Sequence, residues 1–140
     1  METKKPEKRK IRSFRDLDVY QSSYACSIEI HRKILPKLPG NEKWDLKDQL
    51  LRASKAVPRL IAEGFAKKHQ RAGFQKYFDD AMVEANETGV CLDRVKDIYD
   101  IEVEFCTVFV DRYDKIGRQL FLLSEAWDKF KNKRRITDND

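Results

Sequence analysis

The segment DQLLRASKAVPRLIAEGF, residues 48–65, decides the fold. Its apolar and small residues recur every three or four positions, which is typical of one buried helical face. Pro58 cannot donate a hydrogen bond to the Ser54 carbonyl, and its ring crowds that oxygen. Because the pattern continues in register on both sides of Pro58, we predict one kinked helix rather than two helices. The positions of this face are Leu50, Ala53, Val57, Leu60, Ile61 and Gly64.

Four helical segments follow from the same periodicity along the chain. We expect helices over residues 16–35, 42–68, 72–99 and 102–131. Pro36, Pro39 and Gly40 end the first helix, and Asn41 is the expected N-cap of the second. The predicted inner face of the first helix is Leu17, Tyr20, Tyr24, Ser27, His31 and Ile34. That of the third is Phe74, Phe78, Ala81, Ala85, Thr88, Leu92, Val95 and Tyr99. That of the fourth is Phe109, Tyr113, Ile116, Leu120, Leu123, Trp127 and Phe130.

Long helices with short connections predict an all-α fold, an antiparallel up-down-up-down four-helix bundle whose second helix is kinked by proline. We expect the bundle to span residues 14–131. Residues 1–13 are polar and basic, and we expect them to form a disordered arm. Residues 132–140 are expected to form a flexible tail.

Composition limits the class of protein. The chain has 140 residues, of which 38% are charged, and no apolar run reaches the roughly 20 residues that cross a membrane. Its three cysteines, Cys26, Cys91 and Cys106, are far apart and sit among apolar positions. We therefore expect reduced core thiols, a cytoplasmic location and no membrane association.

Three stretches resemble a known family. Asp48-Gln49-Leu50 to Ala62-Glu63-Gly64, around Pro58, is similar to the signature of the four-helix-bundle proteins encoded within intervening sequences of bacterial 23S rRNA genes. The opening FRDLDVY, residues 14–20, and residues 74–88, which end in Asn-Glu-Thr, resemble further parts of its pattern. Ala56 and Leu60 depart from it, because the family usually has Ser and Asn there.

The resemblance implies a four-helix bundle that assembles as a homopentamer with a central opening. The accessory proteins of diversity-generating retroelement reverse transcriptases resemble the same family. Two settings follow: a protein of an rRNA intervening sequence, or an accessory subunit that binds a reverse transcriptase and its template RNA.

Apolar residues outside the inner faces independently indicate self-association. They widen the apolar arcs of the third and fourth helices beyond what a bundle core needs, although scattered surface apolar residues are also ordinary. These residues are Tyr77, Met82, Val83, Phe105, Val108, Val110, Phe121 and Leu122.

The sequence shows no catalytic constellation. His31 and His69 are the only histidines, and neither has a Glu or Cys at metal-ligand spacing or the upstream arginine of helical ribonucleases. Asp80, Glu84 and Glu87 share one face of the third helix and could bind a divalent ion. We interpret them instead as an acidic face that pairs with basic residues, and we expect no enzyme activity, cofactor or metal.

Two basic features remain, and both suit a polyanion. The net charge of +5 equals the excess carried by residues 1–15, because the remaining residues hold equal numbers of each sign. Three cations line one side of the second helix, and three more follow it in the next turn. The candidate nucleic-acid-binding residues are Lys4, Lys5, Lys8, Arg9, Lys10, Arg12, Arg52, Lys55, Arg59, Lys67, Lys68 and Arg71.

The sequence therefore predicts a non-enzymatic homo-oligomer that binds nucleic acid, and we expect this nucleic acid to be RNA. The accessory subunit of a reverse transcriptase is one alternative. A protein-interaction scaffold is another, in which the arginines serve only an interface between helices or subunits.

Overall fold

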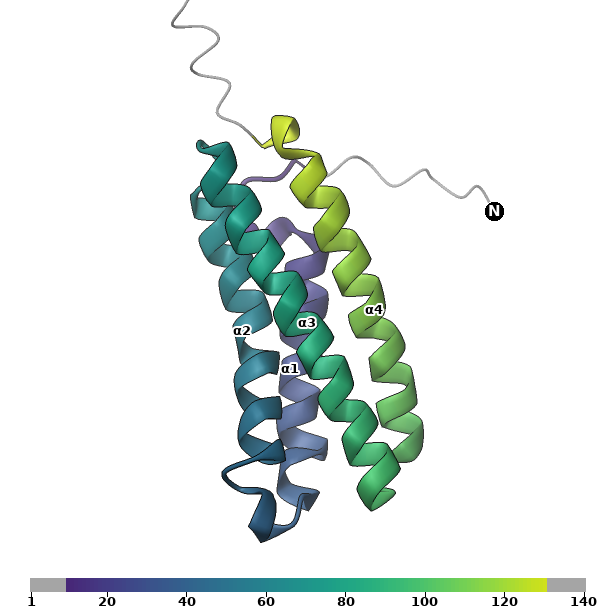
Figure 1. Cartoon of the computed structure of the whole chain (residues 1–140). Coiled ribbons are helices and arrows are strands. Elements are labelled where there is room, and N and C mark those ends of the chain that lie inside the picture. The colour runs from purple at the N-terminus through teal and green to yellow at the C-terminus, as the bar shows by residue number, and fades with distance from the viewer. Residues whose placement is uncertain (1–9, 131–140) are drawn as a thin grey trace, which may run out of the picture.

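Four long helices lie side by side along one axis (Figure 1). The computed structural model describes residues 10–130, and within that range it contains helices and no strand. The all-helical prediction is therefore confirmed. The long helices are α1 (Asp18–Lys33), α2 (Leu46–Ala66), α3 (Arg71–Tyr99) and α4 (Val103–Glu125). Short 3-10 helices join or flank them: η1 (Phe14–Asp16), η2 (Leu35–Lys37), η3 (Gly40–Glu42) and η4 (Trp127–Lys129).

Helix α2 packs against both α1 and α3, and it is continuous through Pro58. All six positions of its predicted apolar face are buried, and so are Ala56, Pro58 and Phe65. The loss of one hydrogen bond at Pro58 is tolerated because tertiary packing surrounds the helix. The prediction of one helix rather than two is confirmed, and the bend at Pro58 stays a prediction.

Gly64 allows α2 and α3 to approach closely. A Cβ atom at this position would lie 2.7 Å from Cδ1 of Phe78 and 3.0 Å from Cβ of Tyr77. Phe78 is fully buried, and its ring lies 4.4 Å from that of Phe74, centroid to centroid. Because the aromatic ring occupies the place of a side chain at Gly64, any larger residue there must displace the core.

The predicted inner faces of α3 and α4 are confirmed. Seven of the eight predicted α3 positions are buried and Tyr99 is partly buried. On α4, Phe109, Tyr113, Ile116 and Leu120 are buried and Leu123 is partly buried, and the last two predicted positions are partly buried beyond the end of this helix. The three cysteines are free thiols in the core, and burial raises the pKa of Cys91 and of Cys106 to about 11. Core thiols with such pKa values stay protonated at neutral pH.

The predicted inner face of α1 is wrong in part. Tyr24 and His31 are exposed, and the buried positions include Val19, Cys26 and Ile30. The helix is turned so that this aliphatic and thiol stripe enters the core, while Tyr20 packs at its edge and Tyr24 lies outside it. Tyrosine is amphipathic, so the spacing of tyrosines alone does not identify the buried face.

Two helix ends also differ from the prediction. Helix α2 begins at Leu46 rather than near residue 42, because Asn41 lies within η3 and is not its N-cap. Helix α4 ends at Glu125 rather than at residue 131. The amide of the next residue, Ala126, donates to the carbonyls of both Leu122 and Leu123. A tertiary contact follows this break, because the Trp127 indole N–H donates to the Lys68 carbonyl at 3.0 Å.

We predict that Gly64→Ala lowers the free energy of unfolding by about 1–3 kcal/mol, because the methyl group overpacks the contact with Phe78. Urea unfolding followed by circular dichroism measures the change. Gly89→Ala is the matched control, since a Cβ there meets no atom within 4 Å. Glycine inside a helix has an entropic cost that alanine lacks, so this variant should be more stable than the wild type by about 0.5–1 kcal/mol. Equal stabilities for the two variants would contradict the proposed close approach.

Candidate nucleic-acid interface

The N-terminal basic arm lies mostly outside the described residues. Lys4, Lys5, Lys8 and Arg9 precede residue 10, and so does most of the predicted segment 1–13. Lys10 and Arg12 are described and exposed. The Arg12 amide donates to the Asp16 carboxylate at 2.8 Å, which ties the arm's last residues to η1. The predicted tail, residues 132–140, lies wholly outside the described range.

Helix α2 brings three predicted cations together on its exposed side. Arg52, Lys55 and Arg59 are all exposed and follow one another at successive turns. Their positions follow from the fold, because the opposite side of α2 is held in the core by Leu50, Val57 and Ile61. The structure therefore places this part of the predicted site on one continuous surface, which we call the α2 stripe (Arg52, Lys55 and Arg59).

The two arginines of the α2 stripe form ion pairs within the helix. Arg52 pairs with Asp48 at 3.4 Å, and Arg59 pairs with Glu63 at 3.2 Å. Exposed pairs at this spacing contribute only about 0.3–0.5 kcal/mol each, so a phosphate could replace either carboxylate. Among residues 10–130, no carboxylate pairs with Lys55.

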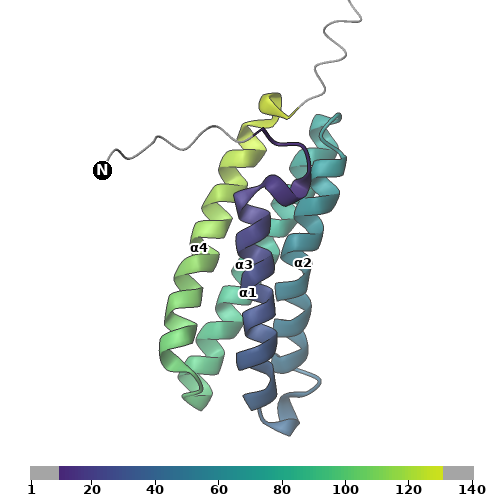
Figure 2. The same cartoon turned by 180° about the vertical axis from the view of Figure 1, so that it is seen from behind.

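The remaining predicted cations lie at the turn between α2 and α3. Lys67 and Arg71 are exposed, whereas Lys68 is half-buried, with its Nζ 4.2 Å from the centroid of the Phe65 ring. The Lys68 carbonyl accepts the hydrogen bond from Trp127, so Lys68 also serves the fold. This turn and the described N-terminal segment lie at the same end of the bundle (Figure 2).

The acidic residues of α3 (the acidic row, Asp80, Glu84 and Glu87) border the α2 stripe. Burial raises the pKa of Glu84 and the neighbouring Glu87 raises it further, while Arg59 and Arg52 oppose the shift. Asp80 pairs with Lys76 at 3.2 Å, in keeping with the predicted pairing of this row with basic residues. Within the described residues, no group of three or more His, Cys, Asp or Glu side chains could hold a metal ion.

A groove between α1 and α2 adjoins the α2 stripe, and the sequence reasoning missed it. Its volume is about 600 Å³, and its walls include Tyr20, Tyr24 and His31 from α1 and Lys55 and Arg59 from α2. Pro58 lies between these two cations in the sequence and also lines the groove. The tyrosines at positions 20 and 24 could have revealed it, had they been assigned to the outer face of α1.

The 3-10 helix η1 contributes Phe14 to the lining of this groove. Ser13 caps η1, where its hydroxyl accepts a hydrogen bond from the Arg15 amide at 3.2 Å. This turn holds the Phe14 ring edge-on to Tyr20, with 4.8 Å between the centroids. The Arg15 guanidinium lies over the Phe14 ring at 4.5 Å, which adds a further cation beside the groove.

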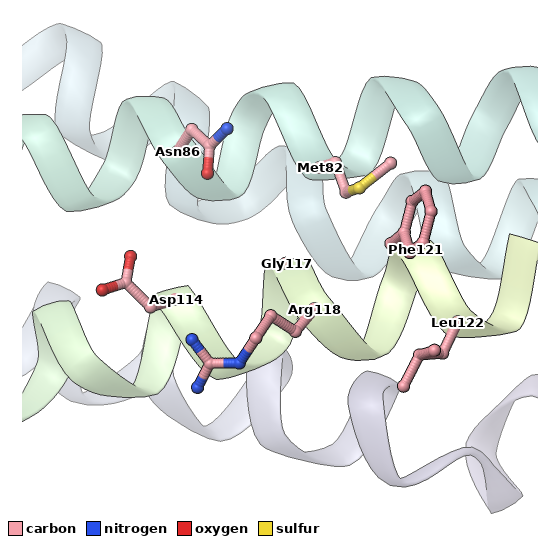
Figure 3. A pocket seen from close by; sticks show the side chains of 7 residues that line it. All are labelled: Met82, Asn86, Asp114, Gly117, Arg118, Phe121 and Leu122. Carbon is pink, nitrogen blue, oxygen red and sulfur yellow. The ribbon is translucent and has the colours of Figure 1, made fainter.

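A second hollow lies between α3 and α4, on the surface predicted to self-associate (Figure 3). Met82 and Phe121 lie near each other at one end, and Asn86, Asp114 and Arg118 lie toward the other. Its volume is about 580 Å³. Val83, Val108, Phe121 and Leu122 are exposed, whereas Tyr77, Met82, Phe105 and Val110 are partly buried against the core. The predicted surface is therefore a mixture of exposed apolar residues and the edge of the core.

None of the helices in residues 10–130 has the length and apolar character of a membrane span.

Comparisons with known proteins agree with this architecture. A solved structure from Bacteroides thetaiotaomicron VPI-5482, described as a protein with unknown function from the S23 ribosomal protein family, is similar to the chain. The TM-score is 0.66 at 22% identity, over 76% of this chain and 95% of that one, and at such identity the likeness shows the fold alone. No curated protein sequence matches the chain. The model of the family described as 23S rRNA-intervening sequence protein matches residues 15–121, so the chain belongs to that family.

Proposed function

We propose that this protein is a non-enzymatic, homo-oligomeric RNA-binding protein of the rRNA intervening-sequence type, which acts in the cytoplasm. The observation that carries the proposal is the α2 stripe. Its three cations are exposed on one helix face, and no carboxylate from residues 10–130 lines the groove beside it. Exposed cations beside such a groove attract phosphate.

The bundle topology supports this placement. We propose that consecutive helices alternate in direction and that Pro58 bends α2 around its neighbours. The short connections support the first statement, and the colour gradient of Figure 1 runs in opposite senses along α3 and α4. The missing hydrogen bond at a buried interior proline supports the second.

We place the contact between copies on the outer face of α3 and α4. Phe121 and Leu122 expose 53% and 64% of their surface there, and Val83 on α3 exposes 62%. Exposed apolar residues gathered beside a hollow mark association surfaces. A homopentamer, as the family resemblance implies, would present five α2 stripes to one RNA and raise its avidity.

The scaffold function remains the second candidate, because both arginines of the α2 stripe already have carboxylate partners. In that case the ion pairs would serve an interface with a protein. The accessory role beside a reverse transcriptase combines both functions, because such a subunit would bind the enzyme and its template RNA.

We predict that Arg52→Gln, Lys55→Gln and Arg59→Gln together weaken binding to a labelled RNA hairpin with single-stranded flanks by on the order of tenfold or more. If each cation meets one phosphate, the slope of log affinity against log salt should become shallower by about 2 to 3. A mobility-shift titration at several salt concentrations measures both quantities.

The matched control is Arg32→Gln, Lys43→Gln and Arg94→Gln, which makes the same change of charge at exposed positions outside the α2 stripe. It should keep most of the affinity and the slope of the wild type. Equal losses in the two triple variants would mean that only net charge matters. Wild-type binding that is absent or independent of salt would favour the scaffold.

We predict that Phe121→Arg with Leu122→Arg converts the oligomer to a monomer of about the 16.6 kDa protomer mass, because two charges cannot be buried between copies. Size-exclusion chromatography with light scattering measures the mass, and circular dichroism checks the fold. Trp44→Arg with Ile98→Arg is the control, since both residues are exposed apolar side chains elsewhere. A wild-type monomer, or dissociation by the control alone, would refute this interface.

A further inference from the structure

We propose that the α1–α2 groove takes an unpaired base of single-stranded RNA, while Lys55 and Arg59 hold the adjoining phosphates. This inference rests on the proposed function and deepens it, because it names the form of RNA that the protein prefers. It depends on three features of the groove: its aromatic wall, its charge and its unused polar groups.

The aromatic wall forms a continuous shelf along one side of the groove. The rings of Tyr20 and Tyr24 are nearly parallel, at 21°, with centroids 5.9 Å apart. Phe14, the first residue of η1, packs edge-on against Tyr20 and adds a third ring to the wall. Tyr24 exposes 50% of its surface although it stacks on Tyr20. A half-exposed ring that continues a stack offers a face on which a base can stack, and base–aromatic stacking tolerates any sequence.

The opposite wall supplies positive charge and an apolar floor. Lys55 and Arg59 flank the groove from α2, and Pro58 and Ala62 line it between and beyond them. Within residues 10–130, the residues that line this groove include no Asp or Glu. By contrast, the α3–α4 hollow contains Asp114, and a third hollow between α1 and α4 contains Asp18. Of these three surfaces, the α1–α2 groove is therefore the most compatible with a phosphate backbone.

Polar groups at the groove are free to read a base edge. Within residues 10–130, neither the Tyr24 hydroxyl nor the His31 ring makes a hydrogen bond to another side chain or to the backbone. Both groups can exchange water for the polar edge of a base. The volume of about 600 Å³ falls within the range of about 300–1,000 Å³ typical of sites that hold a small ligand.

The groove and the proposed contact surface lie on different faces of the bundle. Helices α3 and α4 face the viewer in Figure 1, whereas α1 lies in front beside α2 in Figure 2, which is turned by 180°. The proposed contact on α3 and α4 therefore lies on a different face of the protomer from the α1–α2 groove.

The test compares RNAs that differ only in their bases. Fluorescence anisotropy is measured at about 100 mM salt with an oligouridylate of about 12 nucleotides, an abasic strand of equal length and a duplex of equal length. The wild type should bind the oligouridylate about 5- to 150-fold more tightly than the abasic strand, as expected for stacking of one base.

Tyr24→Ala should abolish this preference and leave duplex affinity unchanged, because it removes the stacking face and no cation. Tyr24→Leu keeps an apolar side chain against Tyr20 and should behave like Tyr24→Ala, so a folding defect would not mimic the result. Tyr24→Phe retains the ring and should retain the preference. Uridine monophosphate should compete far more weakly than the strand, because it lacks the neighbouring phosphates.

Three results would overturn the inference. In the first, Tyr24→Ala binds the oligouridylate as tightly as the wild type. In the second, Tyr24→Ala weakens the binding of the oligouridylate and of the abasic strand by the same factor. In the third, uridine monophosphate binds as tightly as the strand, which would make a free nucleotide the occupant. If the glutamine variant of the α2 stripe still weakens RNA binding in the first two cases, the proposed function survives without this inference.

Discussion

The close contact between Gly64 and the Phe78 ring constrains the rest of this bundle. Because the ring lies where a Cβ of residue 64 would be, Phe78 of α3 packs directly on the backbone of α2 at that level. The same helix is held on its other flank by α1, so most of its circumference is fixed by neighbours. The side of α2 that remains exposed carries the α2 stripe. The apolar pattern of one segment thus sets both the core and the surface offered to a partner.

This dual use of α2 explains how a proline is retained in the middle of a buried helix. Pro58 removes one backbone hydrogen bond, yet contacts on both flanks keep the helix intact. Its ring also lines the α1–α2 groove, between the two cations that flank it. In the proposed function, the residue that disturbs the helix is therefore part of the binding surface and is supported by the packing around it.

The sequence was most informative for helices whose buried face is marked by one strong apolar pattern. It predicted the buried faces of α2, α3 and α4, because aliphatic and phenylalanine side chains leave the position of the core unambiguous. It failed on α1, where tyrosines competed with a stripe of Val19, Cys26 and Ile30. It failed at the end of α4, because the hydrogen bond from Trp127 to the Lys68 carbonyl joins residues 59 positions apart. The cations of the α2 stripe could be found from spacing alone, but the groove could not, since it depends on the rotation of α1.

The central claim is that RNA meets the protein on the α1–α2 side, where the α2 stripe adjoins the aromatic shelf. Ultraviolet crosslinking of the protein to single-stranded RNA, followed by mass spectrometry of the crosslinked peptides, tests it most directly. We expect crosslinks at Tyr20 or Tyr24 and in the α2 segment that contains Lys55 and Arg59. Crosslinks confined to α3 and α4, or none at a protein concentration that saturates binding, would contradict it.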